Sequence, residues 1–259
     1  MAYDLIDSIS VRGTRLEGYA IVVGINGYTN GITRLRTAVP DAVSVARALV
    51  KSPHHYRVHL VADDAGEVSR MVATLPREQA TRITITTNAS ASDIWNAVKA
   101  VATAAPVDSA LIFYFAGHGM SHMFKNRPEG FLLPADARCV NGELELLTCI
   151  SMSKIHDYLS DVKSRHVLAI LDCCFAGAVR WGADTLTRDV PTTLLHEHTY
   201  EQYVNGKARQ VIVSAGADEK AVEYKRDGDP AMDGDGAAQL HSPSYAKNNN
   251  LWKSLMRSA

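Results

Sequence analysis

Short apolar runs alternate along the chain with segments of helical periodicity. The runs at 19–25, 109–115 and 166–171 are continuous rather than alternating, which is typical of strands covered on both faces of a parallel sheet. Further strand-like runs lie at 56–61, 83–87 and 210–214, and helices are predicted at 40–50, 66–80, 152–159 and in a segment capped by Ser92. The repeated strand–helix–strand order predicts an α/β fold, a three-layer α/β/α sandwich around a mostly parallel sheet.

Two local signals refine this pattern. Pro76 interrupts the helix predicted at 66–80, because proline lacks the N–H that a helix interior needs. A hairpin is expected to join 131–134 to 144–150, with Asn141-Gly142 at its turn, a dipeptide that accepts the positive φ of tight hairpins. We therefore expect a small antiparallel element beside the parallel sheet.

Composition excludes several classes of function. The chain has 259 residues, 46% of them hydrophobic and 21% charged, with a formal net charge of -1. It has no global basic field for a nucleic-acid backbone or an anionic membrane, and no apolar stretch approaches the ~20 residues that span a bilayer. The N-terminal residues lack a secretory pattern, and four cysteines do not make a disulfide scaffold in a chain of this size. We therefore expect a cytoplasmic protein without membrane or nucleic-acid partners.

Two of the strongest strands end in chemically reactive residues. One is followed by Gly117-His118-Gly119, and the other by Asp172-Cys173-Cys174. Because ligands bind at the carboxyl ends of strands in open parallel sheets, a thiol and an imidazole are expected at one edge. The imidazolium would stabilise the thiolate that is needed for nucleophilic attack.

The two cysteines are expected to point in opposite directions, so that only one can face His118. Backbone N–H groups of Gly119 and Cys174 are candidates for an oxyanion hole. The competing interpretations are a buried structural cysteine with an ordinary histidine, or a zinc site. Zinc is disfavoured because adjacent cysteines do not have ligand spacing and no Cys-x-x-Cys occurs.

These residues carry a resemblance to a known family. The ordered set of Tyr19–Ile25, Pro40-Asp41-Ala42, 113–119 and 171–177 resembles the caspase-like cysteine peptidases, and among them the metacaspase type. The spacing between His118 and Cys174 is close to the ~50 residues noted for caspases. The resemblance extends from about Tyr19 to near the C-terminus.

The resemblance implies a role for individual residues. His118 matches the catalytic histidine, Cys174 the nucleophile and Cys173 a variable position. Asp41 and Asp172 match the two acidic residues of the first specificity pocket, which implies cleavage after Arg or Lys through charge-assisted contacts. Taken singly, Asp41 could instead cap a helix and Asp172 could accept a strand-end hydrogen bond.

The resemblance also implies how the chain is divided. One peptidase domain is expected over 1–259, with a large-subunit-like part at about 17–179, a connector at 180–208 and a small-subunit-like part at 209–259. The small-subunit-like part supplies Ser214 and Asp218 as further substrate-binding candidates. An enzyme specific for Arg or Lys could cut itself at one of the basic residues around the connector, which are Arg180, Arg188, Lys207 and Arg209.

No cofactor or metal is expected for the bond cleavage itself. Calcium activates many eukaryotic members of the family, and the acidic candidates here are Asp184, Asp189 and the glycine-rich loop at 227–236. That loop lacks EF-hand spacing, so a solvated acidic loop is the preferred interpretation. The expected partners are a protein or peptide substrate and a sensor or regulatory domain or protein.

Two other classes of function were weighed against a peptidase. A caspase-fold scaffold that binds partners without cleaving them is disfavoured because both His118 and Cys174 are retained. A phosphate-binding domain is disfavoured because no glycine-rich phosphate motif follows the first strand. The preferred hypothesis is a cysteine endopeptidase with a Cys-His dyad, since no third orienting carboxylate is evident.

Overall fold

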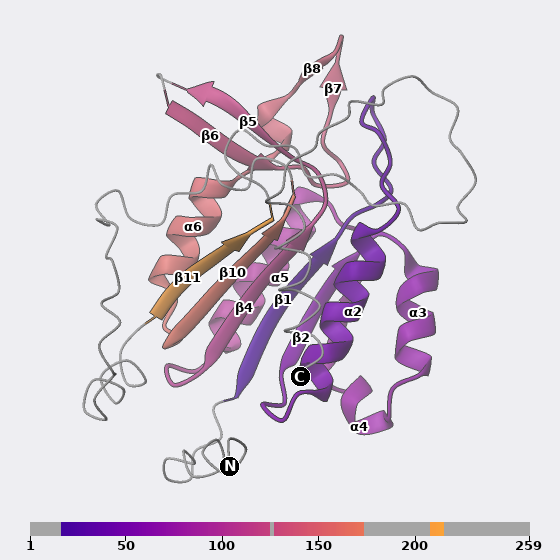
Figure 1. Cartoon of the computed structure of the whole chain (residues 1–259), viewed down its shortest axis with the longest axis vertical. Helices are drawn as coiled ribbons and strands as arrows, with labels where there is room; N and C mark the ends of the chain where they lie inside the picture. The colour runs from indigo at the N-terminus through magenta and orange to yellow at the C-terminus, as the bar shows by residue number, and fades with distance from the viewer. Residues whose placement is uncertain (1–16, 125–126, 174–207, 215–259) are drawn as a thin grey trace, which may run out of the picture.

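A six-stranded parallel sheet forms the centre of the molecule (Figure 1). The computed structural model describes residues 17–124, 127–173 and 208–214. All five strand pairings are parallel, and the strand order is β11-β10-β4-β1-β2-β3. The strands are β1 (Gly18–Gly24), β2 (Arg57–Ala62), β3 (Ile83–Thr86), β4 (Ala110–Ala116), β10 (His166–Asp172) and β11 (Ala208–Val213).

Helices cover both faces of this sheet, which confirms the α/β sandwich. One face packs on α2 (Ala38–Lys51) and α3 (Ala65–Ala73), and the opposite face packs on α5 (Ala91–Ala104) and α6 (Met152–Asp161). Alternate residues of the central strands feed the two hydrophobic clusters: Val22 joins the α2 side, whereas Val23 joins the α5 side. Because both faces are buried, every residue of β1 is buried, as its continuous apolar sequence predicts.

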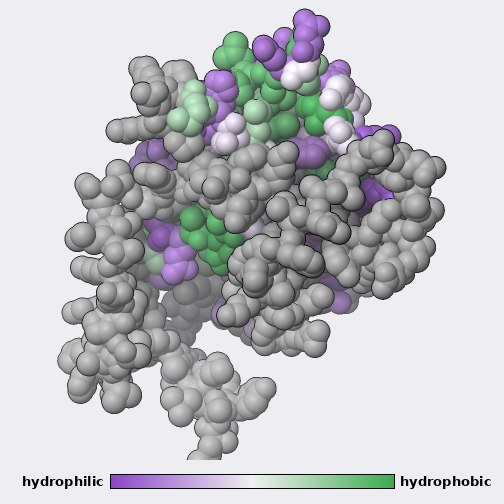
Figure 2. Space-filling model, turned by 45° about the horizontal axis from the view of Figure 1, so that its top comes forward, coloured by the Kyte–Doolittle hydropathy of each residue, from purple (hydrophilic) through white to green (hydrophobic). Residues whose placement is uncertain are grey.

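An outer layer of short antiparallel strands lies beyond the carboxyl ends of the central strands, at the top of Figure 1. One small sheet has the order β5-β6-β9, and β7 and β8 form a separate hairpin. Exposed apolar side chains occur in this layer, among them Met123, Val140 and Leu147 (Figure 2). Its elements are β5 (Gly119–Phe124), β6 (Arg127–Leu132), β7 (Cys139–Val140), β8 (Glu143–Leu144), η1 (Leu146–Thr148) and β9 (Ile150–Ser151).

Three details differ from the sequence expectations. Ser90, not Ser92, caps α5, since its hydroxyl accepts the N–H of Asp93. The helix predicted at 66–80 is two helices, α3 and α4 (Arg77–Ala80), with Pro76 as the cap of the second. The antiparallel element is larger than expected, because β6 pairs with both β9 and the unpredicted β5. Asn141 and Gly142 form a tight turn, with φ of 54° and 81°, but this turn joins β7 to β8 in a separate hairpin and does not connect the paired strands β6 and β9 directly.

The described part of the chain contains no helix that is both long enough and apolar enough to cross a membrane.

Candidate active site

The carboxyl ends of β1, β4 and β10 meet at one edge of the sheet. The chain runs outward from β1 to β2 and β3, then returns to place β4 on the other side of β1, which makes the β1–β4 boundary a topological switch point. Gly24 and Asp172 both pair with Ala116, so the three strands end at the same level. His118 follows the paired Ala116 by two residues, and Cys174, which lies outside the described residues, follows the paired Asp172 by two positions in the sequence.

His118 is held through its backbone and its ring. Its Nε2 lies 2.8 Å from the carbonyl oxygen of Thr33, and its backbone N–H donates to the Tyr28 hydroxyl at 2.8 Å. A carbonyl oxygen can only accept, so Nε2 carries the hydrogen. In the neutral imidazole, Nδ1 is therefore the nitrogen with a free lone pair.

The hydroxyl of Tyr28, a residue of the loop between β1 and α2, bridges His118 and Leu133 next to the paired strands β5 and β6. Leu133 donates its N–H to the carbonyl of His118 at 3.0 Å, but the reciprocal ladder bond is replaced by a bridge. The Tyr28 hydroxyl accepts the N–H of His118 and donates to the carbonyl of Leu133 at 3.0 Å. Burial raises the pKa of this phenol far above its ordinary value, so the hydroxyl keeps its proton and can act as a donor. Gly117 leaves it room, because a Cβ there would lie 2.6 Å from the hydroxyl.

Gly119 presents its N–H away from the neighbouring strand. His118 and Leu133 occupy a hydrogen-bonded position of the antiparallel pair, so the N–H of the next residue, Gly119, points away from β6. On that side β5 is the edge of its small sheet. The Gly119 amide is thus oriented toward a position where a ligand oxygen could accept from it.

A carboxylate lies at the end of β10. Burial raises the pKa of Asp172, and no described Lys or Arg forms an ion pair with it. The hydroxyl of Ser214 faces this carboxyl and lowers its pKa in part, although the buried Oγ makes no hydrogen bond of standard geometry with a described residue. The site therefore has an ionisable acid that forms no ion pair with a described Lys or Arg.

Asp41 lies on the same face of the sheet as Asp172. It is exposed in the first turn of α2, whose N-cap is Thr37, so it is not the helix cap. Burial raises the pKa of the Tyr114 hydroxyl, and the charges of Asp172 and Asp41 both raise that pKa further. The structure thus places Asp41 and Asp172 within electrostatic reach of one group.

Cys173 points into the core. Its side chain is 1% exposed and belongs to the hydrophobic cluster on the α5 and α6 side. Cys173, Cys139 and Cys149 form no disulfide with one another or with another described residue. Cys174 and Asp218 lie outside the described residues, and so do the connector and the acidic loop at 227–236.

Sequence reasoning missed the groups that orient His118. The carbonyl of Thr33 leaves no mark in a sequence, because every residue has one. Asp63, which accepts the N–H groups of Asn26 and Gly27, did leave a signal: it directly follows β2 at the same edge of the sheet. The strand-end argument that selects His118 and Asp172 also selects Asp63.

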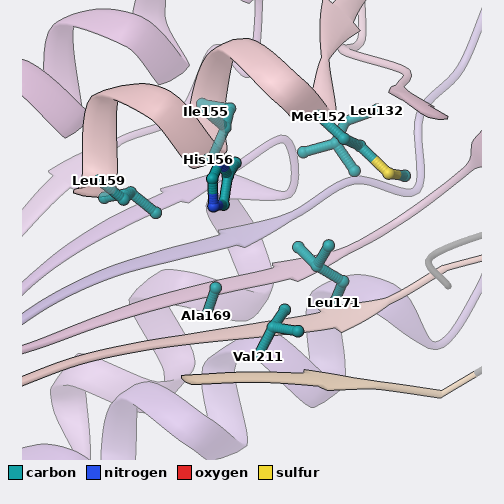
Figure 3. Close-up of a pocket in the computed structure, with 8 residues that line it drawn as sticks. All are labelled: Leu132, Met152, Ile155, His156, Leu159, Ala169, Leu171 and Val211. Carbon is teal, nitrogen blue, oxygen red and sulfur yellow. The ribbon is translucent and has the colours of Figure 1, made fainter. Parts of the chain in front are cut away.

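A separate small pocket lies under α6 (Figure 3). Ile155 and Leu159 of α6 face Ala169 and Leu171 of β10 across it. Its lining is apolar except for His156, whose Nδ1 lies 3.0 Å from Asp157. This composition does not suit a cationic side chain or a hydrolytic reaction. Among the residues that the structure describes, no group of three or more His, Cys, Asp or Glu side chains could hold a metal ion.

Comparison with known proteins gives a family. The family model described as the caspase domain matches residues 17–244. No curated protein matches the chain. Among solved structures, a crystal structure of a protein from Geobacter sulfurreducens is 14% identical over 61% of this chain, with a TM-score of 0.42. The match covers 50% of that protein's chain.

Proposed function

Since the chain belongs to the caspase domain family, and is at that level a cysteine-type peptidase, we propose that it is a metacaspase-type endopeptidase that cleaves after Arg or Lys. The observation that carries the specificity is Asp172: a carboxylate without an ion-pair partner among the described residues, at the same sheet edge as His118. His118 and Cys174 form the proposed catalytic dyad.

The contact of His118 with Thr33 supports different roles for the two nitrogens of the imidazole ring. With Nε2 bound to the Thr33 carbonyl, Nδ1 takes the thiol proton and gives an imidazolium–thiolate pair. The Cys174 thiolate attacks the scissile carbonyl, the C–N bond breaks, and the imidazolium gives its proton to the leaving amine. Water then attacks the acyl-enzyme, releasing the carboxylic acid and restoring the thiol. Thr33 acts as the orienting third member through its backbone oxygen.

The proposed oxyanion hole consists of the amides of Gly119 and Cys174. The orientation of the Gly119 N–H away from β6 supports its part in this role. Such donors act on the charge that develops on the carbonyl oxygen in the transition state, and loss of one typically costs ~2.7–4 kcal/mol of transition-state stabilisation.

The proposed specificity pocket is acidic. Asp172, with Ser214 beside it, binds the guanidinium or ammonium group of the substrate, and the exposed Asp41 adds a second negative charge. Asp218 is included in this proposed pocket only because of the resemblance to the caspase-like peptidases. Because a half-buried carboxylate is costly to ionise without a partner, the substrate's cation would relieve that cost on binding.

Self-cleavage is proposed within or beside the connector, and the structure helps to choose among the candidates. Arg209 lies in β11, and its guanidinium donates to four backbone carbonyls, those of Val162, Ser164, Arg165 and Ala208. A substrate residue must be extended and free to enter the pocket, so Arg209 is the least suited. Arg180, Arg188 and Lys207 remain the candidates, and mass spectrometry of the incubated protein would identify the cut.

A panel of fluorogenic peptides tests the proposed function. We expect cleavage of Arg and Lys peptides, only residual cleavage of a citrulline peptide, no cleavage of an Asp peptide, and loss of activity in Cys174→Ala. Cys173→Ala is the matched control, since this core cysteine is proposed to have no chemical role. Activity that survives Cys174→Ala would contradict the dyad, and a preference for Asp would contradict the acidic pocket.

The same panel, run with and without calcium, decides whether the metal activates the enzyme. It also decides the alternative function, a caspase-fold scaffold. Such a scaffold would cleave no peptide in either condition.

A further inference from the structure

Two groups that hold His118 come from a single loop, residues 25–37, between β1 and α2. Tyr28 accepts the backbone N–H of His118, and the Thr33 carbonyl accepts Nε2–H. The Tyr28 ring also tilts against the imidazole, with ring centroids 4.7 Å apart. The orientation of His118 is therefore only as well defined as the position of this loop.

One carboxylate fixes the start of that loop. Asp63 follows β2 directly, and its Oδ1 accepts the N–H of Asn26 at 3.0 Å while its Oδ2 accepts the N–H of Gly27. Hydrogen bonds to a charged acceptor are stronger than neutral ones. The approach is close enough to require glycine, because a Cβ on Gly27 would lie 2.8 Å from Oδ2.

Asn26 closes the loop upon itself. Its carbonyl accepts the N–H of Leu35 at 3.0 Å, its side-chain amide donates to the carbonyl of Arg36 at 3.2 Å, and its Oδ1 accepts the N–H of Val39 at 3.3 Å. The two ends of the loop are thus joined through Asn26, and Asp63 links this junction to the end of β2, while Asn30 links the middle of the loop to Cys139. Moving Asn26 and Gly27 would move Tyr28 and Thr33 with them.

We propose that Asp63 is a positioning residue for His118: by holding the amides of Asn26 and Gly27, it sets the loop that keeps the hydrogen on Nε2 and leaves Nδ1 for the nucleophile. Asp63 acts only through the loop and touches neither substrate nor reacting atoms. The inference rests on the proposed function only for the role of His118. The placement of the ring is a separate claim and can be tested separately.

Asp63→Asn is the decisive variant. The single oxygen of an amide, at the place of Oδ2, could accept from both Asn26 and Gly27, but without the charge of a carboxylate. The NH₂ group at the place of Oδ1 would then face the N–H of Asn26 instead of accepting from it. Gly27→Ala disturbs the same contact from the other side, by steric contact rather than by charge. The matched control is Asp64→Asn, which removes a neighbouring charge. Asp64 caps α3 instead of holding the loop, and Asn caps a helix about as well as Asp.

The first readout is the tautomer of the ring, independent of catalysis. The full chain carrying Cys174→Ala is labelled with ¹⁵N-histidine, and the ring nitrogens of His118 are observed at about pH 8.5, well above the ordinary pKa of histidine. We expect a predominantly Nε2–H imidazole in the parent and in Asp64→Asn. Asp63→Asn and Gly27→Ala should each give a mixture of the two tautomers.

The second readout is kinetic, with Cys174 intact and an Arg peptide as substrate. A misplaced general acid–base group should lower kcat about 10- to 100-fold while KM changes less than about threefold. Unchanged tautomer and unchanged kcat in both loop variants would overturn the proposal, as would an equal effect of Asp64→Asn. If Asp63→Asn does not fold, the results for Gly27→Ala decide whether the loop contact positions His118. If no form cleaves any peptide, the proposed function fails, and the tautomer measurement still decides the role of Asp63.

Discussion

The ends of β4 and β10 lie side by side in the sheet, yet they hold their polar groups in opposite ways. At the end of β4, His118 has partners for its backbone N–H, its carbonyl and its Nε2. At the end of β10, Asp172 has a raised pKa and no ion pair with a described Lys or Arg. The histidine is restrained by three hydrogen bonds, whereas the carboxylate has no ion-pair partner among the described residues.

The difference corresponds to two requirements of the proposed chemistry. A group that transfers a proton needs a fixed direction, because small errors of placement are costly in rate. A group that binds a charged substrate needs an unsatisfied charge, because a carboxylate already paired with a protein cation would gain little from a ligand. Substitution of His118 should therefore lower the rate of the chemical step, whereas substitution of Asp172 should lower the recognition of a cationic substrate.

The largest effect is expected at the restrained end. His118→Ala should lower kcat on Arg peptides about 10²–10⁴-fold, the usual range for a general acid–base group, with little change in KM. His122→Ala is the control, since His122 is an exposed histidine of β5 four residues further on. Steady-state kinetics is the measurement, and equal activity of the two variants would contradict the role of His118 as a general acid–base group.

The next largest effect is expected from Asp172, at the end of β10, and it should be a loss of substrate recognition. Asp172→Asn should lower kcat/KM for Arg peptides roughly 10²–10³-fold, as loss of one partner of a desolvated charge pair does. The residual activity on a citrulline peptide should change little, because citrulline has the shape of Arg without its charge. An equal loss on both peptides would show that Asp172 supports the fold rather than the specificity.

Asp172→Asn should also make the free protein more stable at neutral pH. Burial raises the pKa of the folded-state carboxyl, so its favourable contribution is present when it is protonated and is lost as the pH rises through that pKa. A neutral amide avoids the loss. Thermal unfolding should therefore show a higher Tm for the variant at pH 7, and the difference should shrink as the pH falls. A lower Tm at pH 7 would mean that the carboxylate has a partner.

A smaller effect is expected from Asp41, because its charge is exposed and screened. Asp41→Asn should lower kcat/KM for Arg peptides only about 2- to 5-fold, in line with exposed ion pairs worth ~0.2–1 kcal/mol. The loss should diminish further at high salt, which is the check that the effect is electrostatic. A loss as large as that of Asp172→Asn would place Asp41 in the pocket itself.

The smallest effect is expected from Ser214→Ala. The Ser214 hydroxyl lowers the pKa of Asp172, so its removal should raise that pKa and move the acid limb of the kcat/KM profile to higher pH. Activity at neutral pH should change less than about twofold. An unmoved acid limb would show that another group controls it.

Much of the central sheet could be predicted from sequence, because strands buried on both faces have continuous apolar segments such as 109–115. The strand-end rule predicted that His118 and the segment Asp172-Cys173-Cys174 follow strands at one edge of the sheet, and β4 and β10 are indeed neighbours, whereas the role of Asp172 came from the family resemblance. By contrast, β5 was missed because Gly119–Phe124 mixes polar and apolar residues at the edge of a small sheet. Either Ser90 or Ser92 could cap α5 judged by residue type alone, and only the folded backbone shows that Ser90 is the cap.

The groups that orient His118 could not be predicted for a different reason. Tyr28 resembles any buried aromatic residue, and only the folded chain shows that its hydroxyl replaces a ladder hydrogen bond between His118 and Leu133. Cys173 is an intermediate case. The alternation of strand side chains predicts that the two cysteines diverge, and the structure shows Cys173 in the core.

The bridge through Tyr28 has a consequence for synthesis of the chain. It joins residues 105 positions apart, and the bond from His118 to Thr33 spans 85 positions. Contacts of such separation each carry a loop-closure cost, and they can form only once both partners have been synthesised. The bridge through Tyr28 therefore needs Leu133, so a truncated product that ends before that residue lacks one of the restraints on His118, although it contains both residues of the contact with Thr33.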